Sequence, residues 1–95
     1  MCIRDSYLAT LGPTYETRSE YRMMRQIGAD VAGMSTVPEV IAATQIGMRI
    51  LGLSMVSNVA NPDLAVKADH TEVLEAGRAA EAKMEAIVRG VLRVS

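Results

Sequence analysis

Residues 7–34, YLATLGPTYETRSEYRMMRQIGADVAGM, hold the pattern that decides the fold. An apolar run at residues 7–11 is closed by Gly12-Pro13, which predicts a short strand that ends in a turn. A second short apolar run, residues 30–34, predicts another buried strand. Two strands joined by a helix-length crossover favour parallel pairing with a right-handed connection.

The crossover between these two runs is predicted to be a helix at residues 17–27. Thr17 and Glu20 have the spacing of a capping box at its start. Gly28 follows directly, and glycine is the residue best suited to the left-handed conformation that ends many helices. Both ends of this helix are therefore marked by the sequence.

The next segment repeats the order of helix and strand. Residues 35–47 predict a helix that Gly47 closes, with Thr36 expected as its cap and Pro38 in the first turn, where a missing N–H is tolerated. Residues 48–57, MRILGLSMVS, are apolar on both faces, which is typical of a central strand covered by helices.

A long final helix is predicted after Asp69, which has capping spacing to Glu72. Apolar residues recur there at steps of three or four, and Arg89 and Arg93 near its end complement the helix dipole. The predicted order is βαβαβα. This order indicates an α/β fold in three layers, with helices packed around a parallel sheet.

The composition suggests part of a larger domain. At 95 residues and 10.2 kDa the chain can form one small domain at most. It has 49% hydrophobic residues but no Trp or Phe, and its single Cys excludes an internal disulfide. We therefore expect a fragment that is only marginally folded by itself. Residues 1–6, MCIRDS, fit no neighbouring element and are interpreted as a non-native leader before residues 7–95.

Charge and ligand counts exclude several function classes. Ten Lys and Arg against eleven Asp and Glu leave a net charge of −1, which disfavours nucleic acid and anionic membranes as partners. One Cys and one His do not make a typical zinc site. No apolar run predicts a signal peptide or a membrane span. We expect a cytoplasmic protein without a metal.

The predicted strand ends carry the polar residues that suit a site. In open α/β sheets, ligands bind beyond the carboxyl ends of the strands. Here those ends carry GPTYE at residues 12–16, Ser35-Thr36 and Ser57-Asn58. Hydroxyls at a helix start suit an anion such as phosphate, but the same residues also serve as ordinary caps and turn residues. By spacing alone both interpretations stay open.

Three stretches together resemble a known family. GPTYET (12–17), GADVAGMSTVPEV (28–40) and HTEVL (70–74) match, in order and spacing, the carboxyl-terminal part of the trimeric purine nucleoside phosphorylases. Members of this family cleave purine ribonucleosides or deoxyribonucleosides with inorganic phosphate, giving the free base and the pentose 1-phosphate. The resemblance implies part of a larger mixed-sheet nucleoside phosphorylase fold, a homotrimer, and phosphate as co-substrate with no cofactor.

The resemblance also implies roles for individual residues. Glu16 matches the carboxylate that accepts hydrogen bonds from the N1 edge of the purine, and Asn58 matches the carboxamide at N7 and O6; both are expected to act in catalysis. The remaining matches are Tyr15 and Ser57 at the purine, Met34 and His70 at the ribose, and Ser35 at the phosphate. A carboxamide can donate a hydrogen bond and an ionised carboxylate cannot, so Asn58 favours inosine and guanosine over adenosine.

Two departures and two alternatives accompany this resemblance. The glycine-rich loop and the Arg/His pair of the family's phosphate site have no match in this sequence, and the segment between Asn58 and His70 looks shorter than in the family. The related methylthioadenosine phosphorylases share a TVPE-type segment, but Asn58 argues against them. A non-catalytic α/β module, such as a signalling receiver, would instead gather acidic residues at the strand ends to hold a divalent metal.

Overall fold

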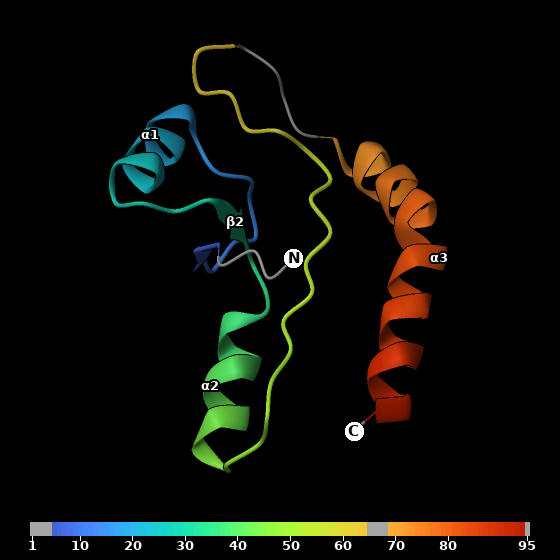
Figure 1. Ribbon diagram of the computed structural model, residues 1–95. Helices are drawn as coiled ribbons and strands as arrows, with labels where there is room; N and C mark the ends of the chain where they lie inside the picture. The colour runs from blue at the N-terminus through green and yellow to red at the C-terminus, as the bar shows by residue number, and fades with distance from the viewer. Residues whose placement is uncertain (1–4, 65–68, 95) are drawn as a thin grey trace. The chain divides into compact units, whose positions relative to one another are not determined.

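The computed structural model describes residues 5–64 and 69–94. Its elements are, in order, β1 (Tyr7–Ala9), α1 (Arg18–Gln26), β2 (Val31–Gly33), α2 (Val37–Gln45) and α3 (His70–Val94) (Figure 1). They fall into two compact units. The first unit holds β1 to α2 and also residues 60–64, whereas the second holds residues 55–59 and α3.

Strands β1 and β2 form the predicted parallel pair. Tyr7 lies opposite Val31, and Ala9 lies opposite Gly33. The N–H of Thr10 continues the ladder by donating to the Gly33 carbonyl at 2.9 Å. A side chain at position 33 would collide with the Tyr7 phenol, so glycine is what lets this ring lie across the neighbouring strand.

Helix α1 lies where the sequence predicts it, with the predicted residues Thr17 and Gly28 at its two ends. The Thr17 hydroxyl accepts the Glu20 N–H at 3.2 Å, and the Glu20 carboxylate accepts the Thr17 N–H at 2.9 Å, so both halves of the capping box are present. Gly28 follows the helix with φ of +91°, a conformation that favours glycine. The predicted helix was slightly too long at both ends.

The third predicted strand is wrong for the described residues. Residues 48–57 contain no strand, and the sheet there has only β1 and β2. The apolar pattern predicted a segment buried on both faces, but a strand also needs a neighbour for its N–H and C=O groups. Ile50 and Leu51 are 44% and 58% exposed instead. Among the described residues the observed order is therefore βαβαα, which fits an α/β fragment but does not confirm the βαβαβα layering.

The two later helices agree better with the sequence. Helix α2 is followed by Gly47, with φ of +76°, where the sequence predicts a helix end. Helix α3 follows Asp69, whose carboxylate accepts the N–H of Thr71 at 3.2 Å, as a capping residue does. Among the described residues, no helix is both long enough and apolar enough to cross a membrane.

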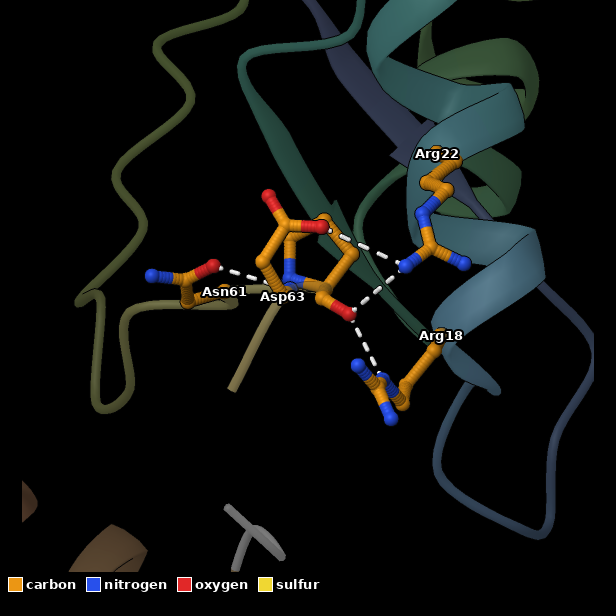
Figure 2. A network of polar contacts seen from close by, with 5 residues as sticks. Arg18, Arg22, Asn61 and Asp63 are labelled. Atoms are coloured by element: carbon orange, nitrogen blue, oxygen red, sulfur yellow. Dashed lines mark hydrogen bonds and ion pairs between the residues drawn. The ribbon is translucent and has the colours of Figure 1, made fainter. Parts of the chain in front are cut away.

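Two arginines of α1 hold a turn that comes from much later in the chain (Figure 2). Arg18 Nε and the Arg22 guanidinium both donate to the Pro62 carbonyl, at 2.6 Å and 3.1 Å. Arg22 also pairs with Asp63 at 3.3 Å, and Asn61 Oδ1 accepts the Asp63 N–H at 3.0 Å. We call Arg18, Arg22 and residues 61–63 the arginine clasp. Within it Pro62 is buried.

Few apolar side chains are buried in the part of the chain that the structure describes. Met24 of α1, at 5% exposure, and Pro62 of the arginine clasp are buried, whereas Ile41, Ile46 and Met48 are all more than half exposed. Burial of apolar surface is the main favourable contribution to folding. The small amount of buried apolar surface therefore predicts a low stability for the chain by itself.

We expect the 95-residue chain to unfold over a broad temperature range. Because little apolar surface is buried, both the enthalpy of unfolding and the cooperativity should be small. Circular dichroism at 222 nm during a thermal scan measures this directly. A sharp transition at high temperature would show that this expectation is wrong.

We expect the double variant Arg18→Gln, Arg22→Gln to open the turn of the arginine clasp. It leaves the Pro62 carbonyl without its two charged donors, and such a bond contributes roughly 1.5–3 kcal/mol. Hydrogen exchange of the Asp63 and Leu64 amides, both bonded inside this turn, should become about tenfold faster or more.

Arg25→Gln is the matched control for the clasp, because Arg25 lies on the same helix and outside the clasp. Asp63→Asn should have a smaller effect than the double variant, since its ion pair with Arg22 is exposed on both sides. Equal exchange rates in the clasp and control variants would contradict a role for the two arginines.

Candidate functional site

Glu16 lies in the connection between β1 and α1 and is held from both sides. The Thr10 hydroxyl donates to its Oε1 at 2.8 Å, and the Tyr21 hydroxyl donates to its Oε2 at 3.2 Å. Thr10 directly follows β1 and Tyr21 belongs to α1. The end of a strand and the first turns of a helix therefore converge on one carboxylate.

Tyr21 remains protonated beside this carboxylate. Burial raises the pKa of the Tyr21 phenol above its usual 10.0, and the negative charge of Glu16 and the hydrogen bond to it raise the pKa further. The phenol is therefore neutral, and able to donate, throughout the neutral pH range.

The backbone at Ser35 forms a γ-turn. Thr36 has φ of +73° and ψ of −53°, and the Val37 N–H donates to the Ser35 carbonyl at 2.8 Å. A positive φ is rare for a β-branched residue and costs about 1–3 kcal/mol. The Ser35 hydroxyl lies 3.3 Å from the Thr36 hydroxyl and 3.4 Å from that of Tyr7. Three hydroxyls thus gather at the start of α2.

This turn corrects the role predicted for Thr36. Thr36 does occupy the cap position of α2, but its side chain makes no capping hydrogen bond. Such a bond normally requires an extended backbone at the cap residue, which the γ-turn replaces. The hydroxyls of Ser35 and Thr36 are consequently not used to cap the helix.

In the second unit, Asn58 is held by side chains at both ends of its amide. The Ser57 hydroxyl donates to Oδ1 at 2.6 Å, and Nδ2 donates to a carboxylate oxygen of Glu72 at 3.0 Å. The contact with Glu72 was missed by the sequence reasoning, which assigned Glu72 to helix capping. Its place inside the HTEVL stretch, two residues after His70, is the signal that could have indicated it.

The other expected site residues lie close to these groups in the sequence. Met34 directly follows β2 and passes beside Gly12, where an added side chain would meet the Met34 sulfur. Tyr15 precedes Glu16 and is 46% exposed. His70 is the first residue of α3 and is exposed.

The candidate residues divide between the two units. The first unit contains Tyr15, Glu16, Met34 and Ser35, and the second contains Ser57, Asn58 and His70. Within the described ranges, 5–64 and 69–94, no group of three or more His, Cys, Asp or Glu could hold a metal ion. The polar groups of the candidate residues are hydroxyls, the Glu16 carboxylate, the Asn58 carboxamide and the His70 imidazole. Together they suit an uncharged ligand with N–H and C=O groups, and the hydroxyls also suit an anion.

Comparison with known proteins shows which family this chain resembles. Residues 4–93 match the family described as the phosphorylase superfamily. The purine nucleoside phosphorylase of Rattus norvegicus is 48% identical over 85 residues, which cover 87% of this chain and 29% of that protein. Purine nucleoside phosphorylase 1 of Geobacillus stearothermophilus is 45% identical over 87 residues, covering 92% and 32%.

A solved structure agrees with the sequence relatives. The crystal structure of a schistosoma purine nucleoside phosphorylase in complex with hypoxanthine superimposes with a TM-score of 0.79 at 36% identity. The match covers 84% of this chain and 29% of that one. The chain thus spans about 30% of the length of the relatives that it matches. Because the family match extends over nearly all of its residues, the chain belongs to the phosphorylase superfamily.

Proposed function

We propose that this chain is part of a purine nucleoside phosphorylase acting on 6-oxopurine nucleosides such as inosine and guanosine. The reaction would use inorganic phosphate as co-substrate and no cofactor, and would give the free base and the pentose 1-phosphate. The observation that carries this proposal is the pair of hydrogen-bonding groups held in fixed orientations, the Glu16 carboxylate and the Asn58 carboxamide.

Each of the two groups suits one part of a 6-oxopurine. An ionised Glu16 only accepts hydrogen bonds, which suits the N1–H of hypoxanthine or guanine. The amide of Asn58 has a second N–H beyond the one given to Glu72, and this N–H can donate to N7 or O6 of the base. In a purine that lacks the N1–H, the N1 nitrogen is itself an acceptor, and it would lie against the Glu16 carboxylate, which is also an acceptor. This contact is unfavourable.

The chemistry of bond cleavage explains why a donor at N7 helps. When the glycosidic bond breaks, the sugar becomes cationic and the departing purine gathers negative charge. A donor at N7 therefore binds the transition state more strongly than the ground state, which raises kcat. We assign this role to Asn58, with Ser57 beside it and Tyr15 against the base.

Sugar and phosphate binding would involve the remaining residues. We assign Met34 and His70 to the ribose and Ser35 to the phosphate. The γ-turn at Ser35 and Thr36 supports the last assignment, because its hydroxyls are not used as caps and α2 begins there, where the helix dipole favours an anion. We further propose a cytoplasmic homotrimer, in line with the family resemblance.

Asn58→Ala, in a protein of the relatives' full length that contains these residues, should lower kcat for inosine by about 10²- to 10³-fold. This is the usual loss when one donor to the developing negative charge is removed. Steady-state phosphorolysis, followed by release of hypoxanthine, measures it. Gln45→Ala removes an exposed carboxamide from the end of α2 and is the matched control. An unchanged kcat for Asn58→Ala would exclude the assignment.

The 95-residue chain alone should show no phosphorolysis of inosine. The groups that it is proposed to contribute to phosphate binding are limited to the hydroxyls around Ser35, and hydroxyl groups alone do not hold a phosphate dianion firmly. Hypoxanthine release with and without inorganic phosphate checks this. Phosphate-dependent release by the purified chain would refute the expectation.

A further inference from the structure

We propose that Thr10 and Tyr21 are positioning residues, which fix the plane of the Glu16 carboxylate and thereby determine how strongly the site prefers purines with two adjacent N–H donors. This inference rests on the proposed function, because it assumes that Glu16 binds the base. Neither Thr10 nor Tyr21 is among the residues to which the family resemblance gives a role.

The geometry supplies the first argument. The terminal torsion of a glutamate side chain is broad, so an unsupported carboxylate rotates easily. Here Thr10 donates to one oxygen at 2.8 Å and Tyr21 donates to the other at 3.2 Å. Two donors on different oxygens, coming from different elements, define the plane of the group.

The two donors are themselves held by the backbone. Thr10 donates its N–H to the Gly33 carbonyl at 2.9 Å, so the parallel ladder determines its position. The N–H of Tyr21 donates to the carbonyl of Thr17, the cap residue of α1, at 3.0 Å. The carboxylate is consequently oriented by the sheet on one side and by a capped helix on the other.

The hydrogen-bonding capacity of the carboxylate supplies the second argument. An ionised carboxylate has about four acceptor positions, two on each oxygen. Thr10 and Tyr21 each occupy one, so each oxygen of Glu16 keeps one for a ligand. Two remaining positions side by side fit the N1–H and 2-amino group of guanine, whereas hypoxanthine fills one of them.

The test replaces each hydroxyl in the full-length protein. Thr10→Val and Tyr21→Phe keep the shape of the side chain and remove the donor. We expect each to lower kcat/KM for guanosine about tenfold, mainly through KM, because an orienting hydrogen bond to a charged group is lost. Inosine should lose less, since it uses one oxygen of the carboxylate.

Rescue and control variants separate positioning from folding. Thr10→Ser retains the hydroxyl and should restore the preference for guanosine. Thr44→Val removes a hydroxyl that donates to the Val40 carbonyl within α2, so it should leave the ratio of guanosine to inosine unchanged. A similar loss for both substrates in Thr10→Val and Tyr21→Phe would indicate a structural role and overturn the proposal.

A second measurement is independent of catalysis. Glu16→Gln removes the charge beside Tyr21, and should lower the pKa of the Tyr21 phenol toward 10.0 without reaching it, because burial also raises that pKa. NMR of ring-labelled tyrosine, with Tyr21→Phe to assign the signal, follows the titration. An unchanged pKa would mean that the two side chains do not interact, which also overturns the proposal.

The same titration predicts a pH limit for the positioning effect. With its pKa raised above 10.0, Tyr21 donates at every lower pH and loses its proton only above that value. Loss of the Tyr21 proton should therefore not weaken the positioning effect below about pH 10, and a decline from this cause is expected only above that pH.

Failure of this inference and failure of the proposed function give different results. If Glu16→Gln abolishes activity and the hydroxyl variants keep the wild-type substrate ratio, the function stands and the positioning role is wrong. If the wild-type full-length protein cleaves neither inosine nor guanosine, both are wrong.

Discussion

The short parallel ladder between β1 and β2 is the interaction on which the first unit depends. It has few hydrogen bonds, yet it places the ends of both strands at one edge. Thr10 leaves one strand with its N–H bonded to Gly33, and Ser35 follows two residues after that glycine. Thr10, which donates to the Glu16 carboxylate, and the γ-turn after β2 therefore lie at the same edge, because the strands are parallel and in this register.

Glycine at position 33 is a requirement of that ladder. The Tyr7 phenol occupies the space where any other side chain would begin. The ring then reaches the Ser35 hydroxyl, with 3.4 Å between the two oxygens. A residue that looks weak on strand propensity is thus explained by a close approach from the neighbouring strand.

Local signals in the sequence predicted the helices and their ends, because capping depends on a few adjacent residues. Thr17 with Glu20, and the glycines at 28 and 47, are examples. The strand predicted at residues 48–57 failed, since apolarity indicates burial but does not supply a neighbouring strand. The cap expected at Thr36 failed for a related reason, because its spacing fits a cap but its backbone turn prevents the capping bond. The contact between Glu72 and Asn58, which lies 14 residues earlier, depends on the fold and not on local spacing.

The two proposed base ligands are oriented by the same principle in separate units. Both oxygens of Glu16 accept a hydrogen bond from another side chain. At Asn58, Oδ1 accepts from one side chain and Nδ2 donates to another. The assignment at Asn58 follows from chemistry, because the Glu72 carboxylate can only accept and so must face Nδ2, which leaves Oδ1 to the Ser57 hydroxyl. A rotated amide would place two acceptors against each other. The direction of donation at Asn58, on which the proposed preference for 6-oxopurines depends, is therefore determined by Glu72 rather than by Asn58 alone.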